Sequence, residues 1–395
     1  MPWRTNGTKE QRWQFLREYL RKQNGLAALC RRWAISRKTA YKWIRRFHER
    51  GRFGLVDRRR VARRVGNRPG ECWLQRIRRW RARHPTWGAP KLRWALQRRF
   101  GGHRLPSEAA ISRWLKRWGL TRRPRRAAHK GLVRERPRLT LAQHPNDVWT
   151  VDFKGWFRTG DGQRVEPLTI RDLASRYILG IMVLRQQNVR DCRQAFERVF
   201  REYGLPLVIR SDNGTPFGAT GALGLTRLSA WWVKLGIKME FIAPGHPEQN
   251  GAHEQLHRVY QEETSAPAAA SRRGQQIRSN HWRQHYNHHR PHEALAMGVP
   301  ADAYRKSRRT LPAQTKHWRY ELGWESRLVK GKGMISFNGR GRFIGEAFEG
   351  ERVGLKRSRT GVWEVYFGPL QIGELWDRDG TPGIRAVWYQ RKRRR

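Results

Sequence analysis

Residues 205–217, LPLVIRSDNGTPF, contain the pattern that decides the fold. The apolar run that ends at Ile209 predicts a buried strand, and Asp212-Asn213-Gly214 after it predicts a polar turn. In open sheets that carry helices, ligand sites form at the carboxyl ends of the strands. The position of Asp212 directly after this strand therefore indicates a functional carboxylate, although Asp before Asn-Gly is also common in ordinary turns.

Two further acids have unusual surroundings. Residues 148–157, VWTVDFKGWF, alternate like a strand and place Asp152 among apolar side chains, where an acid is costly unless it is paired or binds metal. Glu254 follows PGHPEQNG, a loop rich in Gly, Pro and Asn, and lies at the start of a predicted helix. The alternative is that each acid is a turn residue or a helix cap.

Three acids in such positions predict a site for divalent cations. Clustered carboxylates repel one another unless cations lie between them. Hard oxygen ligands suit Mg²⁺ or Mn²⁺. Asp152, Asp212 and Glu254 are therefore the predicted catalytic residues and metal ligands. Two ions about 3.5–4 Å apart would support phosphoryl transfer.

The segments around these acids predict a mixed α/β core over residues 146–309. PLTIRDLASRYILGIMVL, residues 167–184, predicts two strands around a turn, and residues 189–204 predict an amphipathic helix. Residues 237–244 predict a further strand. Strands followed by strand–helix alternation favour a mixed sheet with helices on both faces.

Positive charge is the strongest compositional signal. The 395 residues carry 84 Lys and Arg against 32 Asp and Glu, a formal net charge of +52. Residues 1–145 hold 42 basic and 7 acidic residues, a net charge of +35, whereas residues 146–300 have a net charge of +5 and residues 301–395 of +12. Such an excess predicts a polyanionic partner. A balanced middle between basic ends favours a catalytic core with nucleic-acid-binding flanks over a uniformly basic protein of the ribosomal kind.

Residues 1–60 predict a helix-turn-helix DNA-binding domain. Trp13, Leu16 and Leu20 share one helical face, and Ser36 is the predicted N-cap of a basic helix. In this motif the last helix enters the major groove. The predicted DNA-contacting residues on that helix are Arg37, Lys38, Tyr41, Lys42, Arg45 and Arg46. The alternative is an ordinary three-helix bundle with a solvated basic face.

The pattern of short helices and turns recurs in residues 61–120, which predict a second helix-turn-helix-like DNA-binding domain with Ser107 as a helix cap. Residues 121–145 are rich in Pro and Arg and predict a basic linker laid along phosphate. Residues 310–395 combine frequent Gly with short β-like runs, such as VWEVYFG at 362–368, and end in RKRRR. This spacing predicts a small β-barrel with a basic tail.

The remaining composition excludes several classes of protein. The three cysteines, Cys30, Cys72 and Cys192, are too far apart in sequence to suggest a disulfide framework or a zinc site. No apolar run reaches the length of a membrane span, and the N-terminus lacks the apolar core of a signal peptide. We therefore expect a soluble, cytoplasmic protein without membrane contact, associated with the nucleoid.

Several motifs resemble one family. WTVDFKG at 149–155 and SDNGTPF at 211–217 resemble its two aspartate motifs, and PGHPEQNGAHEQLHR at 244–258 resembles the loop and helix that supply its glutamate. HYNHHRPHEAL and GVPADAYRKS resemble the segment that closes its core. GAPKLRWAL and SEAAISRWL resemble its paired N-terminal DNA-binding units. Over roughly residues 5–310 the chain thus resembles the bacterial insertion-sequence DDE transposases, whose core is similar to that of retroviral integrase.

The resemblance implies a ribonuclease-H-like core in which Asp152, Asp212 and Glu254 hold two Mg²⁺ or Mn²⁺ ions. It implies a homo-oligomer that acts on double-stranded DNA, both element ends and target. The enzyme would hydrolyse a phosphodiester to free a 3′-hydroxyl and then join that hydroxyl to target DNA. Open alternatives are a DNA-binding regulator, an inactive remnant, and a nuclease that does not transfer strands.

The region between the second and third acids departs from the family pattern. Its 41 residues are more than usual, and GATGALGLT at 218–226 is the expected insertion. Glu248 competes for the role of the final glutamate, but Glu254 follows Asn250-Gly251 as the motif requires. The loop 245–251 is expected to become ordered on DNA. His253, His257 and Arg258 are then expected to face the scissile strand, the alternative being a solvated polar helix face.

Overall fold

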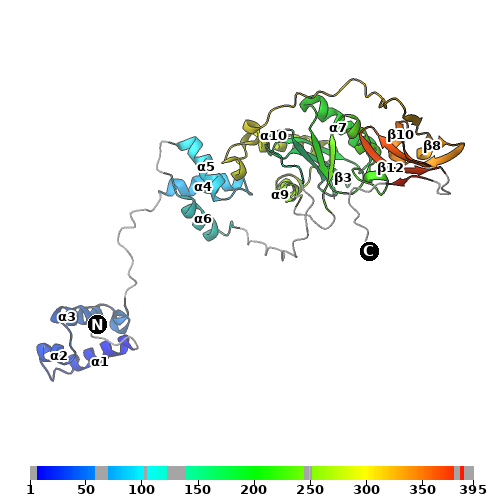
Figure 1. Ribbon diagram of the computed structural model, residues 1–395. Helices are drawn as coiled ribbons and strands as arrows, with labels where there is room; N and C mark the ends of the chain where they lie inside the picture. Colours follow the sequence, from blue (N-terminus) through cyan, green and yellow to red (C-terminus); the bar gives the residue numbers. More distant parts are fainter. Residues whose placement is uncertain are drawn as a thin grey trace. The chain divides into compact units, whose positions relative to one another are not determined.

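A computed structural model describes residues 7–57, 70–101, 105–121, 139–243, 249, 251–377 and 383–386. Contacts between Cα atoms divide the chain into two compact units, Met1–Pro69 and Gly70–Arg395 (Figure 1). The predicted linker at 121–145 and the competing Glu248 fall largely or wholly outside the described residues. The same holds for most of the loop 245–251 and for the tail 391–395.

The first unit is a helix-turn-helix domain, as predicted. Its helices are α1 (Thr8–Leu20), α2 (Leu26–Arg32) and α3 (Arg37–Arg50), followed by a 3-10 turn at Gly51–Leu55. The Ser36 hydroxyl caps α3 by accepting a hydrogen bond from the amide of Thr39 at 3.1 Å. The apolar face of α1 differs from the prediction, because Phe15 is buried while Leu20 is 47% exposed.

The second unit begins with the helices α4 (Glu71–Arg83), α5 (Ala89–Phe100) and α6 (Glu108–Arg117). Ser107 caps α6 as predicted, accepting from the amide of Ala110 at 3.2 Å. The three helices share a small core in which Ile77, Leu92, Leu96 and Ile111 are fully buried.

A mixed sheet forms the centre of the second unit (Figure 1). Its strands are β1 (Val148–Phe153), β2 (Phe157–Arg158), β3 (Arg164–Asp172), β4 (Ile178–Leu184), β5 (Val208–Ser211) and β6 (Lys238–Phe241). The order is β2-β3-β1-β5-β6, with β4 also paired to β3. Strands β1, β5 and β6 run parallel, whereas β3 is antiparallel to β1 and to β4. The predicted mixed sheet is confirmed.

Helices cover both faces of this sheet. On one face α7 (Val189–Tyr203) and α8 (Arg227–Lys234) pack Phe196, Phe200 and Trp232 into the main apolar core. On the other face α9 (Gly251–Tyr260) and α10 (Arg272–His289) form a second cluster that includes Leu256, Tyr260 and Trp282. A π-helical turn at Gln261–Ser265 follows α9, a 3-10 turn lies at Glu293–Leu295, and α11 spans Pro300–Ala303.

The C-terminal region forms an antiparallel sheet in the order β13-β12-β11-β10-β7, with a separate hairpin β8-β9. The strands are β7 (Glu325–Leu328), β8 (Met334–Phe337), β9 (Arg340–Phe343), β10 (Arg352–Arg359), β11 (Val362–Phe367), β12 (Leu370–Trp376) and β13 (Arg385–Ala386). Within the described residues the edge strands β7 and β13 do not pair with each other. The region is therefore a β domain as predicted, but closure into a barrel is not confirmed.

The expected insertion has a structural role. Ala222, Leu223 and Leu225 are buried in the core of the C-terminal sheet, together with Ala230 and Val233 of α8. The insertion thus joins the central core to the C-terminal sheet. Across the described part of the chain, every helix is too short or too polar to cross a membrane.

Candidate active site

The sheet brings two of the predicted acids to one end. Strands β1 and β5 are parallel neighbours whose last Cα partners are Thr150 and Arg210. Asp152 follows Thr150 by two residues, and Asp212 follows Arg210 by two residues. Both carboxylates are partly buried, and both lie at the carboxyl ends of their strands, on the same side of the sheet's strand ends. The register therefore supports a shared site, as the sequence predicted from the strand ends.

The turn that carries Asp212 is held locally. Its carboxylate accepts a hydrogen bond from the amide of Gly214 at 3.2 Å. The side-chain amide of Asn213 donates to the main-chain oxygen of Ile242, just beyond β6, at 2.7 Å. The Asp-Asn-Gly segment is therefore a polar turn as expected, and its contacts tie the end of β5 to the end of β6.

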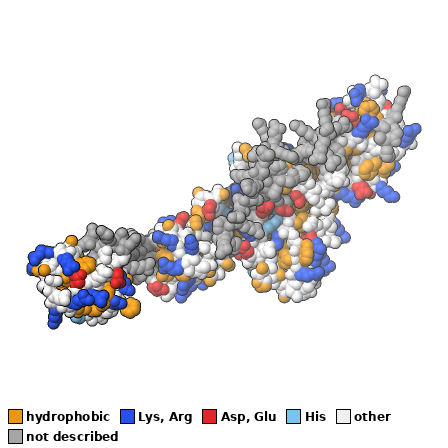
Figure 2. All heavy atoms as spheres, turned by 90° about the horizontal axis from the view of Figure 1, so that it is seen from below, with side chains coloured by type: hydrophobic (Ala, Val, Ile, Leu, Met, Phe, Trp, Pro, Cys, Tyr) orange, Lys and Arg blue, Asp and Glu red, His pale blue; other side chains and the backbone are white. Residues whose placement is uncertain are grey.

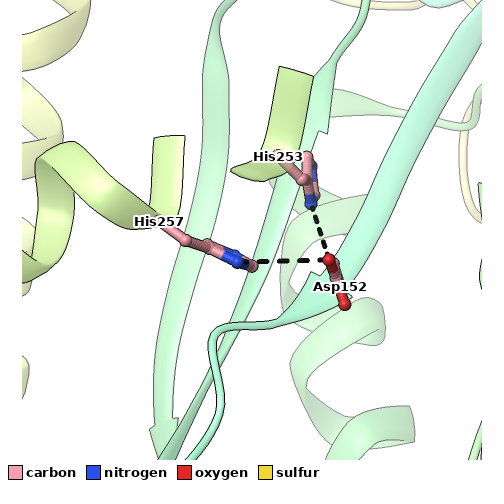
Figure 3. Close-up of side chains that lie close together, drawn as sticks. All are labelled: Asp152, His253 and His257. Carbon is pink, nitrogen blue, oxygen red and sulfur yellow. Dashed lines mark ion pairs between the residues drawn. The ribbon is translucent and has the colours of Figure 1, made fainter. Parts of the chain in front are cut away.

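Two histidines fasten helix α9 to the sheet beside Asp152. His253 and His257 are one helical turn apart and both face the strands (Figure 3). The Nε2 atom of His253 is 2.9 Å from the Thr150 hydroxyl, and Nε2 of His257 is 2.8 Å from the Thr169 hydroxyl. Thr169 lies opposite Asp152 in the β1–β3 pairing. The helix that carries Glu254 is thereby fixed to the strand that carries Asp152.

The hydrogen bonds determine which ring nitrogen of His257 carries no proton. The Thr169 hydroxyl donates its one proton to the main-chain oxygen of Asp152 at 3.0 Å. It must therefore accept from Nε2–H of His257, which leaves Nδ1 of the neutral ring with a lone pair. This Nδ1 lies 4.0 Å from the Asp152 Oδ2, as does Nδ1 of His253 (Figure 3).

Burial keeps both imidazoles neutral. His253 is completely buried, and burial lowers its pKa well below the ordinary value, with a further contribution from His257. Burial, and secondarily the charge of Lys154, lowers the pKa of His257 to about 4. At neutral pH these two side chains therefore hold α9 against the sheet through hydrogen bonds between uncharged groups.

The cluster has the chemistry of a cation site. One oxygen of Asp152 and one ring nitrogen each from His253 and His257 lie within 4.8 Å of one another. Nδ1 of His253 is buried and has no hydrogen-bond partner among the described residues. The Nδ1 lone pair of His257 faces the Asp152 carboxylate, which is unfavourable unless a proton or a cation lies nearby, so these side chains fit a divalent ion. Within the described residues this is the one such triad, and Asp212 and Glu254 are not part of it.

The predicted residues of α9 differ in their exposure to solvent. Glu254 is exposed on α9, next to His253, and Arg258 is exposed one turn later. His253 is expected to face the scissile strand once DNA is bound, whereas in this structure its ring is buried against Thr150. His257 also points inward, with a side chain only 13% exposed. Both rings pack against the sheet because the face of α9 that carries them also carries apolar Leu256 and Tyr260.

The predicted basic face of α3 is accessible. Arg37, Lys38, Tyr41, Lys42 and Arg45 are exposed, and Arg46 is half-buried. Lys42 and Arg46 lie over the buried ring of Trp43 at 4.6 and 4.9 Å from its centroid. Lys and Arg side chains are spread widely over the visible surfaces of both units (Figure 2).

The two threonine anchors were not anticipated from sequence. Side chains two residues apart on a strand share a face. In VWTVDF this rule places Thr150 on the same side as Asp152. A polar residue at that position of an otherwise apolar strand was the available signal. The matching signal on α9 was the pair of histidines four residues apart.

Family comparisons agree with this architecture. An integrase core domain family matches residues 142–247, and a second integrase core domain family matches residues 235–300. The C-terminal domain of the IS481 family transposases matches residues 325–381. A helix-turn-helix domain family matches residues 11–64, and a homeodomain-like family matches residues 39–115.

Two bacterial proteins are similar in sequence. The uncharacterized 31.7 kDa protein of insertion element IS407 from Burkholderia multivorans is 30% identical over 227 residues, which cover 55% of this chain and 76% of that protein. The uncharacterized 39.2 kDa protein of insertion element IS476 from Xanthomonas euvesicatoria is 29% identical over 186 residues. That alignment covers 45% of this chain and half of the Xanthomonas protein.

Solved structures of integrases are more distant. The HTLV-2 integrase catalytic core in complex with magnesium is 15% identical and superposes with a TM-score of 0.32, covering 42% of this chain and all of that one. The catalytic core of BIV integrase is 17% identical with a TM-score of 0.31, covering 40% and 93% of the two chains. A simian T-cell lymphotropic virus intasome chain is 12% identical with a TM-score of 0.36, covering 80% and 100%.

Proposed function

Because the chain belongs to the insertion-sequence transposases with an integrase-type core, a family of DNA-cutting and DNA-joining enzymes, we propose that Asp152, Asp212 and Glu254 carry out its chemistry. The reaction would begin with water attacking a phosphodiester at an element end, which frees a 3′-hydroxyl. That hydroxyl would then attack target DNA in the same site. The observation that carries the proposal is the β1–β5 register, since it brings Asp152 and Asp212 to one sheet edge.

The chain's own residues would position the reactants. Asp152 and Asp212 are held by paired strands and by the turn contacts of Gly214, so their carboxylates have little freedom. Helix α9 would carry Glu254 to the same edge, because His253 and His257 fix the helix to Thr150 and Thr169. Rigid supports of this kind favour reaction, because catalytic groups need not reorganise in the transition state.

We propose two Mg²⁺ or Mn²⁺ ions as cofactors, held by Asp152, Asp212 and Glu254. When bound, such ions activate the attacking oxygen and stabilise charge on the leaving oxygen. The Asp152 carboxylate and the facing Nδ1 lone pair of His257 support a positive charge at this end of the sheet. Nitrogen ligands are less suited to Mg²⁺ than to Mn²⁺ or Zn²⁺. We therefore assign the histidines to positioning α9.

DNA contacts are proposed for the α3 residues Arg37, Lys38, Tyr41, Lys42, Arg45 and Arg46, and for exposed Arg258 on α9. The proposed domains are residues 1–60 and 61–120 for DNA binding, 121–145 as linker, 146–309 for catalysis and 310–395 as the C-terminal β domain. Exposed cations on α3 suit the phosphates beside a major groove.

The active species is proposed to be a homo-oligomer assembled on double-stranded DNA of a bacterial nucleoid. Each chain offers one set of three acids, whereas two element ends must be joined to target together. Light scattering of the protein with DNA ends should find at least two chains per pair of synapsed ends. A complex with a single chain for both ends would contradict this assembly.

A strand-transfer assay separates the proposal from its alternatives. The protein is incubated with Mg²⁺ or Mn²⁺, a labelled duplex that ends in the flanking repeats of its own element, and a target plasmid. An active transposase yields nicked ends and joined products, whereas a nuclease yields nicks without joining. A regulator or inactive remnant yields bound but uncut DNA, and that result would exclude the proposed chemistry.

A further inference from the structure

A pocket outside the catalytic edge has the composition of a nucleotide site. It lies between α4 and α5 on one side and α10 on the other, with a volume of about 480 Å³. Pockets for small ligands commonly span about 300–1,000 Å³. The lining includes three indole rings, from Trp80, Trp87 and Trp94, and no carboxylate.

The aromatic rings of this pocket are already stacked. His84 lies over Trp87 with ring centroids 4.1 Å apart and planes 17° apart. The ring of His285 from α10 lies to the side of this pair, 5.3 Å from His84 and 6.4 Å from Trp87. A planar base can insert beside these rings, because every nucleobase has a π-face. Burial lowers the pKa of His84 to about 4, so its ring stacks as a neutral imidazole at pH 7.

The rim of the pocket is cationic. Arg98 and Arg99 of α5 are exposed, and Arg98 lies over the Trp94 ring at 5.2 Å from its centroid. Neither arginine forms an ion pair with a carboxylate in the described part of the chain. Guanidinium groups beside aromatic faces suit a ligand that combines a flat ring with a phosphate.

The two walls of the pocket are held together by separate contacts. Arg290 donates to the Thr86 hydroxyl at 3.0 Å and to the Glu263 carboxylate at 3.2 Å, and Thr86 also bonds Glu263. Trp282 donates to the second oxygen of Glu263 at 2.7 Å. These contacts join the second helical domain to the core beside the pocket, so Trp94, Arg98 and Arg99 are not required for that attachment.

We propose that this pocket binds one unpaired nucleotide of the DNA substrate. The base would stack on Trp94 beside the His84 and Trp87 rings, and its phosphate would lie near Arg98 and Arg99. Unpaired bases become available at an element end once a strand has been cut. The inference uses only the shown activity on DNA and is independent of which acids perform the catalysis.

The test uses the full-length protein and a duplex with a short 3′ overhang that contains one 2-aminopurine. Stacking in the pocket should quench the fluorescence of the 2-aminopurine in the wild-type complex. Trp94→Leu should restore the fluorescence and weaken overhang binding about ten-fold, since base–aromatic stacking contributes about 1–3 kcal/mol per base. Trp94→Phe should retain quenching. Binding of a blunt duplex of the same sequence should change less than about two-fold.

A second variant guards against misfolding, because Trp94 packs partly against the helical core. The double change Arg98→Gln and Arg99→Gln alters only exposed side chains and should also weaken overhang binding. Arg79→Gln, an exposed α4 arginine outside the pocket lining, serves as the matched control.

Unchanged overhang binding and quenching in both pocket variants would overturn the proposal. Equal weakening of overhang and blunt duplex would also overturn it, because the pocket would then contact paired DNA only. Cutting at the wild-type rate by Asp152→Asn, Asp212→Asn and Glu254→Gln would count against the catalytic assignment and leave this inference intact, because overhang binding does not depend on those acids.

Discussion

At the scale of single residues, the position of α9 depends on two hydrogen bonds between imidazoles and threonine hydroxyls. His253 and His257 are buried and neutral, so they contribute geometry without charge. Each threonine lies on a strand next to Asp152, either two residues before it or directly opposite it. Small changes at Thr150 or Thr169 should therefore alter the position of Glu254, which lies on the same helix as the two histidines.

Replacing these hydroxyls tests the positioning role. Thr150→Val and Thr169→Val preserve side-chain shape but leave a buried imidazole N–H or lone pair unsatisfied. The expected cost in the free energy of unfolding is about 1–3 kcal/mol. DNA cutting should fall about ten-fold or more, while DNA affinity stays within about two-fold.

The matched control is Thr159→Val, which also removes a buried hydroxyl but lies in the turn before β3. It should lower stability measured by urea unfolding and leave cutting unchanged. If Thr150→Val and Thr159→Val cut DNA equally well at equal stability, the two histidines have no positioning role.

At the scale of elements, the attachment of the C-terminal sheet depends on α8 and the insertion before it. Lys234 of α8 is 6% exposed and lies 2.8 Å from both carboxylate oxygens of Glu351. Arg227 of the same helix donates to the main-chain oxygen of Glu346 at 3.2 Å and also pairs with Glu349. The apolar residues of the insertion are buried beside these pairs.

Breaking the buried pair should loosen this attachment. Among the described residues, Lys234→Met leaves half-exposed His317, whose Nδ1 lies 3.2 Å away, as the remaining partner of the Glu351 carboxylate. Urea unfolding should show a loss of about 1.5–3 kcal/mol, the range for hydrogen bonds to charged groups. Lys238→Met is the control, because its ion pair with Glu240 involves a lysine that is 63% exposed. That change should cost less than about 1 kcal/mol.

The contact between the second helical domain and α10 should be sensitive to acid. Burial, and secondarily the charge of His285, lowers the pKa of His84 from 6.5 to about 4. Glu263 acts in the opposite direction, while Arg290 and Arg83 add to the lowering. Between these two values the unfolded chain binds a proton that the folded chain rejects. Stability must therefore fall as the pH drops from 6.5 towards 4.

A pH series of thermal unfolding checks this sign. His84→Gln should flatten the loss of stability between pH 6.5 and 4, whereas the exposed control His281→Gln should not. An unfolding temperature that rises on acidification, or an identical slope for wild type and His84→Gln, would show that His84 is not buried in this contact.

How far the sequence predicts these elements depends on the kind of signal. Alternation in VWTVDF and the buried run before Asp212 predicted β1 and β5 and their shared edge, because strand periodicity reports burial directly. Phe15 is buried and Leu20 is exposed because of the way α1 packs against its neighbouring helices, and the sequence of one helix does not determine that packing. The insertion lacks periodicity, so its partner sheet could not be inferred. Strand spacing likewise does not determine which edges pair, and closure of the barrel is not confirmed within the described residues.

At the scale of the whole molecule, the positive charge is concentrated outside the region proposed to carry out catalysis. The catalytic region from 146 to 300 is nearly balanced at +5, while residues 1–145 carry +35. Such a division allows tight attachment through the flanks while the acids at the sheet edge remain available for cations. Binding should therefore be strongly dependent on salt, and catalysis should be separable from binding.

The salt dependence can be assigned to α3. Arg37→Gln, Lys38→Gln and Lys42→Gln should each reduce the slope of log K against log salt by about 0.9, the value per phosphate contact on duplex DNA. Arg21→Gln, an exposed cation just after α1, should leave the slope unchanged. Equal effects from Arg21 and from the α3 residues would indicate a diffuse basic surface in place of a recognition helix.

The most direct test measures cutting and binding in parallel for Asp152→Asn, Asp212→Asn and Glu254→Gln. Each amide keeps the shape of the acid but removes the charge that would hold Mg²⁺. Controls are Asp302→Asn and Glu197→Gln, acids that lie away from the sheet edge on α11 and α7, and Glu248→Gln, the competing glutamate. The account predicts that the first three variants lose cutting and joining while DNA affinity stays within about two-fold, and that all controls remain active. Cutting at the wild-type rate by all three variants in Mg²⁺ would contradict it.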